Sequence, residues 1–195
     1  MNKGRLEAFS DGVIAILITI MVLELKIPKG SDLPALRPML PVFLAYVLSF
    51  VILGIYWNNH HHVLHATDRI NGRILWANLH LLFWLSLIPA VTAWIGDTSS
   101  APVPTAVYGV VLMMAGFAYY ILSTTILALL GPHSRLAAAV GKDVKGKVSV
   151  ALYAVAIPLA LVNRWIADGI YVLVALMWLV PDRRIESKLN ASATR

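Results

Sequence analysis

Apolar residues dominate six stretches of the chain, and turn-forming residues separate one stretch from the next. A transmembrane helix needs about 20 mainly apolar residues, because each residue adds only about 1.5 Å to its length. The breaks contain proline, glycine or asparagine, as in Pro28-Lys29-Gly30 and Gly131-Pro132. The pattern predicts six helices, at about residues 5–27, 40–64, 74–95, 103–130, 148–161 and 165–180.

The last two predicted helices are short for membrane spans, and Pro158 lies inside the first of them. Short segments of this kind either tilt across the bilayer or form a hairpin that the rest of the bundle shelters from lipid. We favour two spans. The sequence therefore predicts an all-α integral membrane protein with six transmembrane helices, folded as a single domain over residues 1–195.

The composition also indicates a membrane protein. Hydrophobic residues make up 59% of the chain and charged residues 13%, whereas soluble domains average roughly 45–50% and about 25%. The net charge of +6 would suggest a nucleic-acid partner only if the basic residues shared one soluble surface. Here they fall between hydrophobic segments, so we expect the lipid bilayer as a partner and no nucleic acid.

The lysines and arginines predict the orientation of the helices. If the helices alternate in direction, twelve of these residues lie on the side of the N-terminus and four on the other side. The positive-inside rule places the richer side in the cytoplasm, so both termini are expected there, in a multi-pass protein of the cell membrane (plasma or inner). The richer side holds Lys3, Arg5, Arg69, Arg73, Arg135, Lys142, Lys145, Lys147, Arg183, Arg184, Lys188 and Arg195; the other side holds Lys26, Lys29, Arg37 and Arg164.

The first predicted helix has two distinct faces when its residues are spaced about 100° apart. An apolar stripe lies within roughly 40° of Ile16, and Thr19 lies on its flank. Such a stripe is ordinarily a surface for packing or for lipid, but several copies around an axis would turn it into a narrow hydrophobic pore lining. The stripe comprises Phe9, Gly12, Ile16, Ile20, Leu23 and Ile27; the opposite face holds Glu7, Ser10 and Asp11.

Asp11 needs a hydrogen-bond donor from another helix. Glu7, four residues earlier, carries the same charge and repels it, and Arg5 is rotated by about 120° from it. A buried carboxylate without a partner would take up a proton instead. Donors on the same side of the membrane occur between Trp57 and His80, so we expect a polar network that fixes the first helix against the second and third.

The histidines suggest metal chemistry only weakly. His61 or His62 would share a helix face with His65, and imidazole suits zinc or copper, but no cysteine or intramembrane carboxylate cluster completes a site. His80 could serve a proton relay, although a lone histidine more often makes one interhelical hydrogen bond. The chain also lacks the P-loop, the dinucleotide-binding glycines and the nucleophile-elbow motif. We therefore expect no metal, no cofactor and no enzymatic activity.

The charged start of the chain resembles the prokaryotic relatives of the lysosomal potassium channel called transmembrane protein 175. The hallmark of that family is an Arg-x-x-x-Phe-Ser-Asp motif, which Arg5, Phe9, Ser10 and Asp11 match. The resemblance continues in the segments 56–61, 75–79 and 85–89. It is dense over residues 4–96 and only topological beyond them.

The resemblance implies a homotetramer of six-helix chains around a pore that the first helix lines. Ile16, Ile20 and Leu23 occupy the positions of the family's hydrophobic gate, and Thr19 takes the place of a hydroxyl that affects selectivity. The family lacks the TVGYG filter of other potassium channels, and so does this chain. The resemblance also implies that the motif bonds to Trp57, to His60 or His61, and to Asn78.

The expected function is passive conduction of monovalent cations, potassium above all. The alternative is a proton-coupled secondary transporter that uses Asp11 and the histidine cluster. Transporters commonly show internal repeats and broken helices near the middle of the membrane. The first helix has neither proline nor glycine between Val13 and Leu25, and the motif occurs once, which favours the channel.

Overall fold

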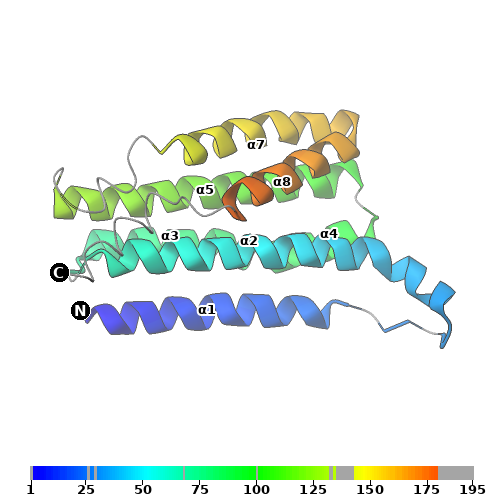
Figure 1. Cartoon of the computed structure of the whole chain (residues 1–195), viewed down its shortest axis with the longest axis horizontal. Coiled ribbons are helices and arrows are strands. Elements are labelled where there is room, and N and C mark those ends of the chain that lie inside the picture. The colour runs from blue at the N-terminus through cyan, green and yellow to red at the C-terminus, as the bar shows by residue number, and fades with distance from the viewer. Residues whose placement is uncertain are drawn as a thin grey trace, which may run out of the picture.

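The protein is a bundle of helices aligned along one long axis (Figure 1). The computed structural model describes residues 2–25, 27–28, 30–67, 69–99, 101–131, 134 and 143–179, and the secondary structure within these residues is entirely helical. The elements are α1 (Lys3–Leu23), the 3-10 helix η1 (Leu33–Met39), α2 (Leu40–His65), α3 (Gly72–Ser86), α4 (Ile88–Asp97), α5 (Pro102–Leu130), α7 (Val144–Val162) and α8 (Arg164–Leu179).

Successive long helices run in opposite directions, with α4 continuing the path of α3 (Figure 1). The start of α1, the α2–α3 connection and the start of α7 therefore lie at one end of the bundle. This end carries the described cations Lys3, Arg5, Arg69, Arg73, Lys145 and Lys147, whereas Arg37 and Arg164 lie at the opposite end. The other predicted flanking cations, Lys26, Lys29, Arg135, Lys142, Arg183, Arg184, Lys188 and Arg195, lie outside the described residues.

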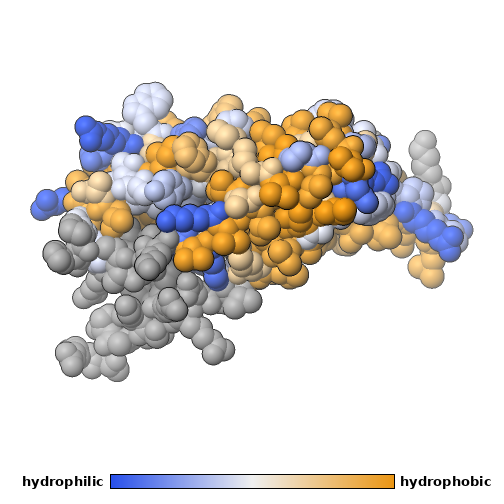
Figure 2. Space-filling model, turned by 90° about the horizontal axis from the view of Figure 1, so that it is seen from above, coloured by the Kyte–Doolittle hydropathy of each residue, from blue (hydrophilic) through white to orange (hydrophobic). Residues whose placement is uncertain are grey.

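Five helical segments are long and apolar enough to cross a membrane, so the chain is a multi-pass membrane protein. They are Lys3–Leu23, Leu33–His65, Gly72–Asp97, Pro102–Leu130 and Val144–Val162. On the face shown in Figure 2, hydrophobic side chains cover the middle of the long axis and most hydrophilic ones gather toward its two ends. This distribution fits a bilayer about 30 Å thick in its hydrocarbon region.

The helices predicted at 148–161 and 165–180 were both expected to be short, but they differ in length in the structure. Helix α7 begins at Val144 and has 19 residues, and Pro158 lies inside it without ending it. Prolines are tolerated in membrane helices where neighbouring groups satisfy the freed backbone carbonyl. The described part of α8 has 16 residues, or about 24 Å of helix, which is shorter than a full span. Its predicted last residue, Val180, lies outside the described residues.

Prolines also explain two further differences from the predicted helices. The segment 74–95 was expected as one helix, but a turn at Leu87 divides it into α3 and α4, because Pro89 has no N–H to donate to the preceding turn. Helix α1 ends at Leu23 and does not reach Ile27, where the following Pro28 disfavours helical geometry. Ile27 therefore does not extend the apolar stripe.

Small side chains let the helices of the second half approach closely. Ala115 and Ala118 of α5, Ala156 and Ala160 of α7, and Ala167 of α8 are all fully buried. Close approach through small residues is how membrane helices gain packing energy when lipid is as apolar as the core. Helix α1 lies at the edge of this bundle, beside α2 (Figure 1).

Candidate functional site on the first helix

Helix α1 buries one face and exposes the other. Leu6, Ser10, Ile14, Leu17 and Met21 recur at intervals of three or four residues and are buried against the bundle. Intervals of three and four residues place side chains on one side of a helix. The predicted stripe lies on the opposite side, where the exposed fractions are 52% for Phe9, 56% for Ile16, 42% for Ile20 and 79% for Leu23.

A buried chain of hydrogen bonds joins α1, α3 and α2. The Ser10 hydroxyl donates to the Leu6 carbonyl at 2.9 Å and accepts from the Asn78 side-chain amide at 2.9 Å. The Asn78 side-chain oxygen then faces Nε2 of His60 at 2.6 Å. Because the Asn78 amide group is committed to Ser10, Nε2 of His60 must carry the hydrogen and donate it. Ser10, Asn78 and His60 are fully or almost fully buried.

A second link connects α1 with α2. The indole Nε1–H of Trp57 donates to Oδ1 of Asp11 at 3.0 Å. One turn before Asp11, the Glu7 carboxylate lies 3.7 Å from the Lys3 ammonium, which also donates to the His65 carbonyl at 3.4 Å. The first three turns of α1 are therefore held to the end of α2 and to α3 by polar contacts on the face opposite the stripe.

The structure distinguishes between His60 and His61, either of which could have been the histidine partner of the motif on the first helix. His60 points into the buried network, whereas His61 is exposed and lies outside it. The His61 ring stacks between Trp57 and His65, with centroid distances of 6.3 Å and 5.7 Å. His80 also differs from expectation, since it accepts from Trp84 of its own helix at 3.0 Å rather than from another helix.

Arg5 and Phe9 are not part of the network within one chain. Both side chains are exposed, and Arg5 makes no side-chain hydrogen bond or ion pair with any residue that the structure describes. Thr19 is exposed beside the stripe, and its hydroxyl donates to the Ile16 carbonyl at 2.9 Å. The oxygen of that hydroxyl remains able to accept a hydrogen bond or to face a cation.

Sequence reasoning missed a second polar cluster, which lies between α2, α4 and α5. The Ser49 hydroxyl lies 2.7 Å from that of Thr92 and 2.9 Å from that of Tyr108, and all three side chains are buried. Hydroxyl groups in otherwise apolar membrane helices are the signal that could have revealed it. The cluster links α2, which carries Trp57 and His60, to α4 and α5.

Comparison with known proteins agrees with this site. The family model described as "Endosomal/lysosomal potassium channel TMEM175" matches residues 5–89, which include Ser10, Asp11, Trp57, His60 and Asn78. A protein of a Chryseobacterium species (strain P1-3), named a potassium channel, is 54% identical over 190 residues, which cover 97% of this chain and 99% of the relative. The chain belongs to the TMEM175 family.

Two further relatives, both described as TMEM175 proteins or homologs, are consistent with this family assignment. A crystal structure described as that of a lysosomal potassium-selective channel TMEM175 homolog from Chamaesiphon minutus has a TM-score of 0.76 to this chain, at 27% identity, and covers 91% of this chain and 96% of the other. The human protein named endosomal/lysosomal proton channel TMEM175 is 40% identical over 96 residues, or 43% of this chain and 19% of the human one. The resemblance expected from the motif is confirmed. The transporter alternative finds no support among these relatives.

Proposed function

We propose that this TMEM175 family member is a potassium-permeable cation channel that conducts passively through a pore lined by α1. The observation that carries the proposal is the division of α1 into a face held by buried polar contacts and a face that exposes Ile16, Ile20 and Leu23. The names of the relatives add the permeant ion, since the Chryseobacterium and Chamaesiphon proteins are both named potassium channels.

A closed pore requires several copies of the chain. One α1 helix presents a single stripe, so it cannot surround an axis alone, and we propose a homotetramer in which four stripes face one another. The membrane is the cell membrane, with both termini in the cytoplasm, because the cation-rich end of the bundle is expected to face that side. Arg5 and Phe9, exposed in one chain, would then lie where neighbouring copies meet.

The proposed constriction consists of rings of Ile16, Ile20 and Leu23. Rings of apolar side chains gate conduction by excluding water when they are narrow and admit hydrated ions when they widen. Thr19 is the one polar residue between Ile16 and Leu23, and we propose that its hydroxyl contributes to a modest preference for potassium over sodium. The polar links through Ser10 and Asp11 set the rotation of α1, so they would determine which side chains face the axis.

Reconstitution tests the proposal. We would place the purified protein in planar bilayers with opposed potassium and sodium gradients and measure the reversal potential. A value displaced toward the potassium equilibrium potential is expected, with a current that does not depend on a proton gradient. Native mass spectrometry of the same sample is expected to give four chains. If fully assembled protein passes no current at any voltage, the channel assignment is wrong.

A further inference from the structure

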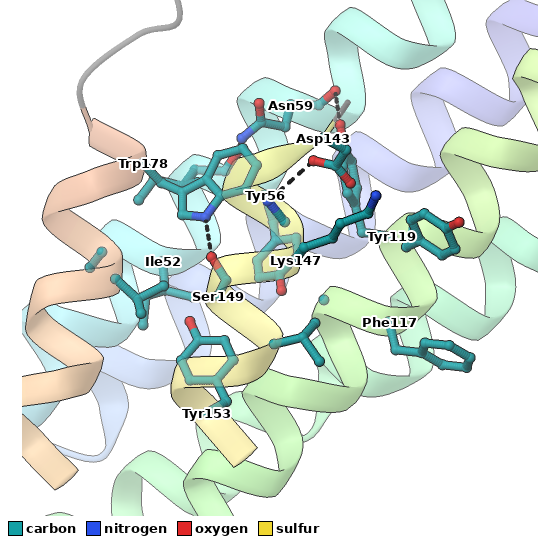
Figure 3. A pocket seen from close by; sticks show the side chains of 17 residues that line it. Ile52, Tyr56, Asn59, Phe117, Tyr119, Asp143, Lys147, Ser149, Tyr153 and Trp178 are labelled. Carbon is teal, nitrogen blue, oxygen red and sulfur yellow. Dashed lines mark hydrogen bonds between the residues drawn. The ribbon is translucent and has the colours of Figure 1, made fainter. Parts of the chain in front are cut away.

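A cavity of about 300 Å³ lies on the side of α2 away from its contacts with α1, enclosed by α2, α5, α7 and α8 (Figure 3). Its wall is mainly apolar and aromatic and includes Ile52, Ile55, Phe117, Val150 and Val174. None of the residues that hold α1 lines it. Its volume lies at the lower end of the range of roughly 300–1,000 Å³ found for small-molecule sites.

One small residue of the wall contributes to the space in the cavity. Gly116 of α5 lines it, and a Cβ there would lie 3.6 Å from the Tyr56 hydroxyl and 4.0 Å from the Val150 side chain, which are ordinary contact distances. A glycine inside a helix costs stability relative to alanine. Gly116 has no left-handed backbone conformation and makes no close helix contact, which are the usual structural reasons for a glycine in a helix. Its main effect is therefore to leave space in the cavity.

Most polar groups of the wall already have partners inside the protein. Trp178 donates to the Ser149 hydroxyl at 2.8 Å (Figure 3). The Asn59 amide donates to the Ile55 carbonyl at 2.9 Å, and the Asp143 carboxylate accepts from the Gly146 N–H at 3.1 Å. A molecule bound in the cavity would therefore find few polar groups that are free to bond with it. The buried part of the occupant must be apolar.

Three phenols are the exception: those of Tyr56 and Tyr153, and that of the exposed Tyr120. The hydroxyls of Tyr56 and Tyr153, which both line the cavity, have no hydrogen-bond partner among the described residues. Each can donate to a carbonyl oxygen. Figure 3 shows both side chains at the cavity, on α2 and α7 respectively.

One end of the cavity lies at the cation-rich end of the bundle, beside the start of α7. Lys147 lines it and has an exposed side chain, and Lys145 places its ammonium 5.9 Å from the centre of the Trp178 ring. Lys147 and Tyr153 are six residues apart on α7, or about 9 Å along the helix. A cation, a hydroxyl donor and an apolar chamber therefore follow one another from the surface toward the membrane interior.

We propose that this cavity binds one acyl chain of an anionic phospholipid, with the phosphate at Lys147 and a glycerol ester carbonyl at Tyr56 or Tyr153. Each part of the lipid meets its chemical complement in the order in which the parts are joined. Basic side chains at a membrane surface attract anionic lipids, and the effect of one lysine corresponds to about a fivefold preference. The site is independent of the pore proposal, because it shares no residue with the face of α1.

Photolabelling in nanodiscs tests the site. The probes are phosphatidylglycerol and phosphatidylcholine that carry the same diazirine-bearing acyl chain, and mass spectrometry locates the labelled peptides. Phosphatidylglycerol is expected to label segments 52–59, 116–120 and 146–153 about fivefold more than phosphatidylcholine. Equal labelling by the two lipids, or labels confined to other segments, would overturn the proposal.

Matched variants separate this site from general lipid contact. Gly116→Leu fills the chamber and is expected to reduce labelling of these segments about tenfold, whereas Gly169→Leu, which adds the same atoms on an exposed face of α8, is expected to leave it unchanged. Lys147→Gln should abolish the preference for phosphatidylglycerol, and Lys147→Arg should retain it. Val150→Phe fills the same space from α7 if Gly116→Leu fails to fold. Undiminished labelling in a folded filled variant contradicts the proposal.

Discussion

The indole of Trp57 on α2 donates a hydrogen bond to the carboxylate of Asp11 on α1, over 3.0 Å, although 46 residues separate them in the chain. This bond lies on the face of α1 opposite Ile16 and Ile20. Helix α1 therefore has a polar side that fixes its position in the bundle and an apolar side that remains exposed. Breaking the bond tests the first property without touching the second.

Trp57→Phe keeps an aromatic ring but removes the N–H, and we expect it to destabilise the docking of α1 by about 1 kcal/mol, because the bond is partly exposed. The expected result is a lower melting temperature in detergent and altered channel current. Asp11→Asn keeps an oxygen that can accept from Trp57, so it should lose less stability than Asp11→Leu. Equal losses for the two Asp11 variants would show that the hydrogen bond is unimportant.

Asn78 supports the most buried polar contacts of the site. Asn78→Leu leaves the Nε2–H of His60 without its acceptor, which costs about 1–3 kcal/mol for a buried group. Thermal unfolding followed by circular dichroism should show a clear decrease in melting temperature. Asn58→Leu is the matched control, because Asn58 is exposed on α2. A similar decrease in both variants would indicate a general effect of removing an amide.

The exposed stripe can be tested with single cysteines, because the chain contains none. Ile16→Cys, Ile20→Cys and Leu23→Cys should react with a water-soluble methanethiosulfonate reagent and lose current, since a thiol ionises and reacts in water but not in lipid. Val22→Cys is the control, as Val22 is exposed on a different side of α1. If all four variants resist the reagent, the stripe faces lipid and α1 does not line a pore.

Thr19→Val removes a hydroxyl while conserving shape, so it isolates the polar contribution to ion preference. We expect the ratio of potassium to sodium permeability to fall, with the fold unchanged because the lost bond is to the local Ile16 carbonyl. The reversal potential under bi-ionic conditions measures this ratio. An identical reversal potential in Thr19→Val and the parent protein would remove Thr19 from the selectivity mechanism.

Two glycines of α5 should respond oppositely to alanine. A Cβ on Gly109 would overlap the Tyr171 hydroxyl, which donates to the Thr105 carbonyl, so Gly109→Ala should cost about 1–3 kcal/mol through overpacking. Gly116→Ala meets no close neighbour and should gain roughly 0.5–1 kcal/mol from the improved helix propensity. Melting temperatures should therefore shift down for the first variant and up for the second.

Sequence patterns predicted the helices well where they were long and uniformly apolar, and less well where proline modifies them. The predicted start of the fifth helix at 148 was late, because Lys145 and Lys147 resemble a loop in a hydropathy pattern although α7 already includes them. The turn at Leu87 depends on one missing N–H at Pro89, which a pattern of apolar residues does not register. Helical periodicity, by contrast, correctly separated the exposed stripe from the face of Ser10.

The partners of α1 show where periodicity stops being informative. The residue types around Asp11 indicated that a donor from α2 or α3 was needed, but Trp57, several histidines and Asn78 all satisfied that requirement. The choice between His60 and His61 depends on the rotation of α2 within the bundle, and packing sets that rotation. Arg5 and Phe9 share a motif with Ser10 and Asp11, yet they point away from the bundle.

The sequence alone determined that the chain crosses a membrane several times, that its first helix has a polar and an apolar face, and that it resembles one channel family. These properties follow from local composition and from the fixed 100° step of a helix. The tertiary structure decided which polar groups meet, as in the bonds of Ser10, Asn78 and His60, and where space remains, as in the cavity beside Gly116. Both depend on the distance and rotation between helices, which arise from the packing of side chains far apart in the chain.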